Sequence, residues 1–189
     1  MNLWKECKGL QDYIVGIRRA LHQIPELGTD LPKTQAAICA ELDKLGIPYK
    51  KNQGDSGLIG TIHGGKPGKT ILLRADIDAL PIKEDTGLPF ASKHEGRMHA
   101  CGHDTHAAML LGALRVLNEH RAELAGNVKF VFQTGEEISR GAKVAIKEGV
   151  MDGVDAVFGT HIGSILDPNI PAGTFILVPG CAMASFDRF

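Results

Sequence analysis

The chain has 189 residues, 43% of them hydrophobic, which is enough apolar material to bury a substantial core. Its formal net charge is -1 and its Lys and Arg residues are scattered, so the composition excludes the basic face that nucleic acid or an anionic membrane surface requires. Residues 1–25 carry charges every few positions, and no stretch approaches the ~18 unbroken apolar residues of a membrane span. We therefore expect a cytoplasmic protein that binds neither nucleic acid nor membranes.

Helices and strands are predicted in turn along the first half of the chain. Apolar residues at helical spacing predict helices over residues 3–23 and 32–45, the first of which is ended by Pro25. Residues 57–64 and 70–80 are short, β-branched and bounded by glycines, which is typical of strands. The second of these stretches is nearly all apolar, as in a strand that is buried on both faces.

The second half of the chain alternates helices and strands. The pattern predicts a helix over residues 103–120, a buried strand over 128–132, a short helix over 139–149 and a strand over 155–160. Strands that alternate with helices need crossover connections, so we expect an α/β fold with a mostly parallel sheet that is flanked by helices on both faces. In such a sheet the functional groups collect beyond the carboxyl ends of the strands.

Polar side chains that bind metals follow these strands at the expected edge. Carboxylates follow two of the strands, a histidine follows the last one, and a cysteine and a histidine precede the helix that begins at the same edge. These residues are Asp76, Asp78, Cys101, His103, Glu136, Glu137 and His161. Segments that lie far apart in the sequence are therefore predicted to meet at one edge of the sheet.

Cys101 and His103 form the strongest pair in this set. Each alone has an ordinary explanation, since a histidine at a helix start is usually a surface or capping residue and a lone cysteine is usually a small buried side chain. Separated by one residue in a turn, the thiolate and the imidazole can point at a common centre. Both are ligands that suit zinc, cobalt, nickel or manganese when carboxylates complete the coordination shell. The pair therefore favours a metal site.

Glu136 and Glu137 directly follow an apolar strand. In isolation the two would be interpreted as acidic residues that enter a helix, where the helix dipole favours them. At a sheet edge, one glutamate can bind a metal while its neighbour faces a water molecule. This division suits metal-assisted hydrolysis, which needs a positive centre and a carboxylate that moves the proton.

The remaining polar residues near this edge leave alternatives open. Asp76, Asp78 and Asp104 either cap turns and helices or fix the orientation of a metal-binding imidazole. His106 lies one helical turn beyond His103 on the same face, so it lines the pocket in a metal-site interpretation. The other histidines are interpreted as structural, namely His22, His63, His94, His99 and His120.

Five sequence motifs are distributed over nearly the whole chain. They are RRALHQIPELG (18–28), LLRADIDALPI (72–82), GRMHACGHDTHAAMLLGA (96–113), FQTGEE (132–137) and FGTHI (158–162). In this order they resemble the M20 family of metallopeptidases, specifically the amidohydrolase branch with hippurate hydrolases, N-acyl-amino-acid deacylases and auxin-conjugate hydrolases. The resemblance implies a zinc-exopeptidase-like catalytic domain.

The resemblance also implies a reaction and the residues that perform it. The reaction is metal-dependent cleavage of the amide bond of N-acyl amino acids, with two divalent ions (Mn, Zn, Co or Ni) in the complete site. Glu136 matches the family's general base, which acts on a metal-bridging water, and Asp78 matches a supporting carboxylate of the catalytic group. The positions that match the metal ligands are Cys101, His103, Glu137 and His161.

Members of this family are longer than this chain and contain a lid and dimerisation domain and a late ligand histidine. We therefore expect residues 1–175 to be the N-terminal part of a truncated catalytic domain and residues 176–189 to be the start of the lid, through which the full-length enzyme would form a homodimer. Two alternatives stay open. The first alternative to the amidohydrolase is a catalytically incompetent metal-binding or interaction fragment that lacks the lid and the last ligand. The second is part of a dipeptidase of the same superfamily.

Overall fold

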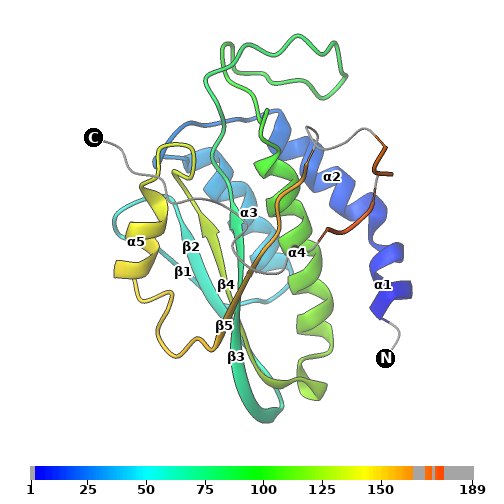
Figure 1. Cartoon of the computed structure of the whole chain (residues 1–189), viewed down its shortest axis with the longest axis vertical. Helices are drawn as coiled ribbons and strands as arrows, with labels where there is room; N and C mark the ends of the chain where they lie inside the picture. The colour runs from blue at the N-terminus through cyan, green and yellow to red at the C-terminus, as the bar shows by residue number, and fades with distance from the viewer. Residues whose placement is uncertain (1–2, 164–168, 172, 177–189) are drawn as a thin grey trace.

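The computed structural model describes residues 3–163, 169–171 and 173–176 of the chain. Figure 1 shows strands at the centre of the fold with helices around them. In chain order the elements are α1 (Leu3–Gly9), α2 (Gln11–His22), α3 (Pro32–Lys44), β1 (Tyr49–Lys51), β2 (Leu58–His63), β3 (Lys66–Asp76), α4 (His103–Glu119), a 3₁₀ turn (Arg121–Glu123), β4 (Ala125–Gln133), α5 (Gly141–Lys147) and β5 (Ala156–Gly159).

The described strands form a five-stranded sheet in the order β1-β2-β4-β3-β5. Strand β3 runs parallel to both of its neighbours, β4 and β5. Strand β2 runs antiparallel to both β1 and β4. The predicted α/β class is confirmed, and the sheet is mixed: its parallel part is β4-β3-β5.

The direction of β2 follows from the short link between β2 and β3. Gly64 and Gly65 make this link and pass the beginning of β4, where the Gly64 N–H donates to the Gly126 carbonyl oxygen at 3.0 Å. A Cβ atom at Gly64 would lie 2.1 Å from that oxygen, so the close approach requires glycine. So short a link cannot carry the chain back along the sheet, and β2 and β3 therefore run in opposite directions.

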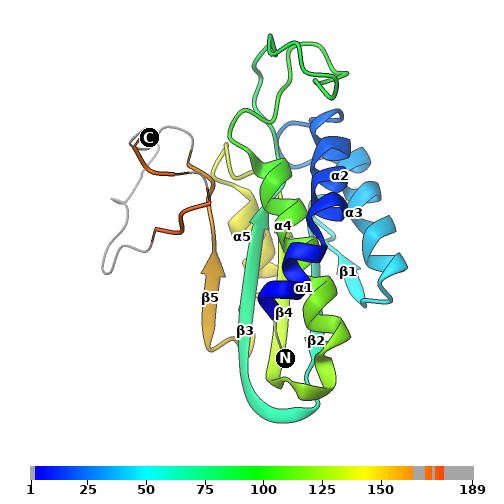
Figure 2. The same ribbon diagram turned by 90° about the vertical axis from the view of Figure 1, so that its right-hand side faces the viewer.

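Side chains of the strands alternate between two apolar layers. Leu58, Phe130 and Phe132 are fully buried against α2, α3 and α4, while Ile59 and Val131 belong to a smaller cluster with Ala145 of α5. Figure 2 shows α2, α3 and α4 on one side of the sheet and α5 on the other. Helices on both faces of the sheet were predicted from the strand pattern, and this prediction is confirmed.

Several predicted boundaries differ from the structure. The helix expected over residues 3–23 is interrupted, because α1 ends at Gly9 and α2 begins at Gln11, and the strand expected over 70–80 ends at Asp76. The short strand β1 was not predicted. The expected start of a lid at residues 176–189 lies, beyond Ile176, outside the described residues, so this domain boundary stays a prediction. In the described part of the chain, no helix has both the length and the apolar character needed to cross a membrane.

A long loop, residues 77–102, joins β3 to α4 beyond the carboxyl end of β3 (Figure 1). Its two arms are held together by backbone hydrogen bonds between Leu80 and Met98, each 3.0 Å long. The Lys93 N–H donates to the Gln23 carbonyl oxygen at 3.0 Å, which attaches the loop to the end of α2. The loop thereby returns to the same edge of the sheet, where α4 begins.

Candidate metal centre

The parallel strands bring the predicted site residues to one edge of the sheet. Asp76 is the last residue of β3, Glu136 and Glu137 shortly follow β4, and His161 shortly follows β5. Because β3, β4 and β5 are parallel, their carboxyl ends share this edge. His103 is the first residue of α4, which begins at the same place.

His103 occupies the centre of this group and is fully buried. Its Nδ1 lies 2.8 Å from the Asp78 carbonyl oxygen, which only accepts, so Nδ1 carries the hydrogen and Nε2 carries the lone pair. That Nε2 atom lies 3.7 Å from Glu137 Oε1 and 3.8 Å from Glu136 Oε2. Among the described residues, neither His103 Nε2 nor Glu137 Oε1 has a hydrogen-bond partner, although both atoms are buried. Buried atoms that carry a lone pair and have no hydrogen-bond partner are typical of metal ligands.

Cys101 completes a set of donors around this point. The ligand atoms of Cys101, His103 and Glu137 all lie within 4.8 Å of one another. Burial and the charges of Glu137 and Glu136 raise the pKa of the Cys101 thiol to about 12, so without a cation the crowded carboxylates oppose the thiolate. Sulfur, nitrogen and oxygen donors in this combination suit zinc and related divalent ions, and the residues therefore fit a metal.

Asp78 holds the two glutamates in place. Its Oδ1 accepts the Glu136 N–H at 3.0 Å and its Oδ2 accepts the Glu137 N–H at 3.1 Å. The residue is buried, and its carbonyl oxygen also accepts the hydrogen of His103. Asp78 therefore fixes the backbone on which two of the predicted functional residues stand, a role that the sequence alone did not distinguish from capping.

We expect Asp78→Asn to weaken metal binding by roughly 10–100-fold, as the loss of a group that orients ligands typically does. A carboxamide has one acceptor oxygen, so one of the two glutamate N–H groups would face an NH₂ donor and lose its bond, which lowers the free energy of unfolding by about 1–3 kcal/mol. Metal titration and denaturant unfolding measure these effects, with the exposed Asp12→Asn as the matched control. Unchanged metal affinity in Asp78→Asn would contradict this role.

Glu136 differs from Glu137 in exposure, with 40% of its side chain accessible against 20%. Burial and the charge of Glu137 raise the pKa of Glu136, and the nearby imidazole of His103 only partly offsets this. A carboxylate with a raised pKa that still reaches solvent is a better proton acceptor than an ordinary surface glutamate.

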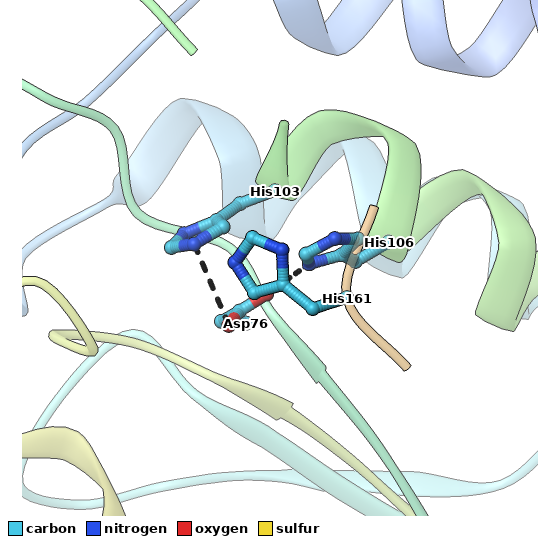
Figure 3. Close-up of side chains that lie close together, drawn as sticks. All are labelled: Asp76, His103, His106 and His161. Carbon is cyan, nitrogen blue, oxygen red and sulfur yellow. Dashed lines mark hydrogen bonds and ion pairs between the residues drawn. The ribbon is translucent and has the colours of Figure 1, made fainter. Parts of the chain in front are cut away.

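A second set of possible ligand atoms overlaps the first and shares His103. Asp76, His103, His106 and His161 each offer an atom within 4.8 Å of the others. Figure 3 shows these four side chains close together. His161 also reaches the first set, because its Nε2 lies 3.4 Å from Cys101 Sγ. All six predicted site residues are therefore brought together, along with Asp76 and His106, which the sequence left undecided.

A buried polar network behind the site was not predicted. Asp104 Oδ2 accepts hydrogen bonds from Arg18 Nε at 2.8 Å and from His22 Nδ1 at 2.7 Å, so Asp104 joins α4 to α2 instead of orienting His103. His22 Nε2 also lies 3.3 Å from Glu84 of the long loop. The related signal in the sequence is the spacing of Arg18 and His22, which places both on one face of a helix.

The pair of His22 and Asp104 makes stability depend on pH. The Asp104 hydrogen bond is the largest effect on His22 and raises its pKa above the ordinary 6.5, although burial and Arg18 oppose this rise. The stabilisation of the fold by this pair is therefore full below pH 6.5, where His22 is protonated in both states. It is lost as the pH rises through the raised pKa of His22 in the folded protein. We expect the difference in unfolding free energy between the wild type and His22→Gln to shrink from about pH 5 to about pH 9. A difference that stays constant over this range would contradict the charged pair.

An α/β fold that gathers thiol, imidazole and carboxylate donors at the carboxyl edge of its parallel strands has the architecture of a metallohydrolase. The chain belongs to peptidase family M20/M25/M40, whose family model matches residues 72–182. This confirms the resemblance of the sequence segments to the M20 family.

Relatives of the chain occur in bacteria, archaea and a plant. The N-acetyl-L-cysteine deacetylase of Bacillus subtilis is 47% identical over 180 residues, which are 95% of this chain and 42% of that protein. Thermostable carboxypeptidase 1 of Saccharolobus solfataricus is 44% identical over 190 residues, which are 99% of this chain and 47% of that protein. The chain therefore spans less than half the length of the curated relatives it matches.

A solved structure shares this fold. The YXEP protein of Bacillus subtilis, described as a dinuclear metal-binding peptidase of the M20 family, superposes with a TM-score of 0.80 at 44% identity. The match covers 87% of this chain and 45% of that one. The described fold is therefore that of an M20 catalytic domain over the matched part.

Proposed function

We propose that the chain is part of a metal-dependent amidohydrolase that cleaves the amide bond of N-acyl amino acids. The observation that carries the proposal is the donor set of Cys101, His103 and Glu137, whose ligand atoms lie within 4.8 Å of one another beside Glu136. A deacetylase of N-acetyl-L-cysteine among the relatives supports this substrate class. A cytoplasmic location and a homodimer stay predictions from the sequence.

The proposed ligands are Cys101, His103, Glu137 and His161. Bound divalent ions supply a positive centre that lowers the pKa of water and polarises the amide carbonyl. Manganese, zinc, cobalt and nickel all remain candidates, because the mixed donor set suits each of them. A dinuclear site is supported by the name of the YXEP relative.

Glu136 is the proposed general base. It takes a proton from the attacking water, whose oxygen bonds to the amide carbon, and returns that proton to the nitrogen as the C–N bond breaks. The products are the carboxylic acid of the acyl group and the free amino acid. Asp78 keeps Glu136 in position through the backbone N–H, and the raised pKa of Glu136 favours its acceptance of the proton.

One other function has specific support. The names of two relatives, a carboxypeptidase and a dinuclear metal-binding peptidase, favour peptides as substrates.

Hydrolysis of paired substrates separates these functions. The protein is loaded in turn with manganese, zinc, cobalt and nickel and is given N-acetyl amino acids and dipeptides with the same C-terminal residue. We expect release of the amino acid from the N-acetyl compounds, and loss of this activity with a chelator. Preferential cleavage of dipeptides would replace the deacylase by a peptidase. Tight metal binding without any turnover would overturn catalysis by this chain.

A further inference from the structure

Both ring nitrogens of His106 are engaged in hydrogen bonds, and Figure 3 shows the one with Asp76. The Ile162 N–H donates to Nε2 at 3.0 Å, so this nitrogen carries the lone pair. Nδ1 therefore carries the hydrogen, which it donates to Asp76 Oδ1 at 2.5 Å. His106 is almost fully buried, and while these bonds persist it has no free nitrogen for a metal ion.

Ile162 connects His106 to the proposed ligand His161. The Ile162 carbonyl oxygen accepts the hydrogen of His161 Nδ1 at 2.7 Å, which leaves His161 Nε2 with its lone pair, 3.4 Å from Cys101 Sγ. The Ile162 side chain lies directly against Gly102, where a Cβ atom would approach it to 2.1 Å. The backbone and the side chain of Ile162 thus both attach the His161 segment to the start of α4.

Asp76 fixes the ring of His106 from the opposite side. This carboxylate is fully buried at the end of β3 and forms an ion pair with Arg74 Nη1 at 2.9 Å. The ion pair with Arg74 and the hydrogen bond from His106 hold this carboxylate in place, so Asp76 keeps the Nδ1–H of His106 directed toward it.

We propose that His106, oriented by Asp76, is a positioning residue that sets the place of the ligand His161 through the backbone of Ile162. The connection runs from β3 through α4 to the segment after β5. These three parts of the fold lie far apart in the sequence and are joined here by two hydrogen bonds of His106. This inference rests on the proposed metal function of the site. The competing assignment is that His106 is itself a ligand, since it lies within the second donor group.

Cobalt(II) titration of a set of variants separates positioning from ligation. The set is His106→Leu, His106→Gln, His161→Ala and the double variant His106→Leu/His161→Ala. The readouts are the affinity for cobalt and the ligand-field spectrum, with thermal unfolding of the metal-free variants as a check on folding. His63→Leu is the matched control, because His63 is exposed and its hydrogen bond goes to Asn127, away from the site.

Positioning predicts a specific pattern of affinities. His106→Leu lowers the affinity for cobalt by roughly 10–100-fold, the range for residues that orient ligands. His106→Gln loses less, because the amide oxygen of glutamine can still accept the Ile162 N–H. In the His161→Ala background, His106→Leu has no further effect, since the ligand that His106 positions is already absent.

The outcomes that overturn the inference differ from those that overturn the metal function. A wild-type protein that binds no cobalt removes the metal function itself. If the wild type binds cobalt and His106→Leu binds it equally well, positioning by His106 is wrong. If the effects of His106→Leu and His161→Ala add, and His106→Gln is as weak as His106→Leu, then His106 is a ligand. Should His106→Leu fail to fold, the comparison of His106→Gln with the wild type decides.

Discussion

Replacement of Glu136 by Gln is expected to lower the turnover number by about 10²–10⁴-fold, which is the usual contribution of a positioned general acid–base group. Glutamine keeps the size of the side chain and the backbone N–H that Asp78 accepts, but it cannot take a proton from water. The metal affinity should stay close to that of the wild type, because Glu136 is not among the proposed ligands. Steady-state hydrolysis and metal titration of the same preparation measure both quantities.

The control for this variant is Glu119→Gln, which changes a surface glutamate of α4 that pairs with Arg115. It should leave turnover unchanged. Turnover in Glu136→Gln that equals the wild-type value would remove Glu136 from the reaction. Loss of metal together with turnover would instead show that Glu136 is a ligand, and the roles assigned to the two glutamates would have to be exchanged.

Replacement of His103 by Ala is expected to have the largest effect on metal binding. His103 belongs to both donor groups, and its Nδ1–H bond to the Asp78 carbonyl oxygen directs Nε2 toward the carboxylates. The affinity should therefore fall by more than the roughly 10–100-fold that the loss of an orienting group causes. Metal titration of His103→Ala measures this fall directly.

The matched control is His120→Ala, because His120 is a partly exposed histidine that pairs with Glu6 and Glu123 away from the site. This variant should bind metal as the wild type does. Equal affinity in His103→Ala and the wild type would mean that the cluster at the sheet edge is not the metal site.

The edge that carries the site was predictable because it depends on strand direction alone. Parallel strands end at one edge, so carboxylates and histidines that directly follow apolar strands must meet there. Glu136, Glu137 and His161 follow this rule, and His103 joins them because α4 starts at the same edge. The types of side chain then indicate a metal site.

Other features depend on contacts that no periodic pattern encodes. The close approach of Gly64 to Gly126, in the short link between β2 and β3, is visible only once the strands are placed. The bonds from Asp78 to the glutamate backbone join residues nearly sixty positions apart, and the pair of His22 and Asp104 joins residues still further apart. Carboxylates in such places have the same local sequence signature as helix or turn caps, so the sequence left their roles open.

X-ray diffraction with anomalous scattering, from crystals grown with zinc, tests the central claim most directly. The account predicts an anomalous peak about 2.3 Å from Cys101 Sγ and about 2.0–2.1 Å from His103 Nε2, with a carboxylate oxygen of Glu137 also bound. Peaks that lie only at other places on the protein, or a fully occupied zinc that contacts none of these three side chains, would contradict it.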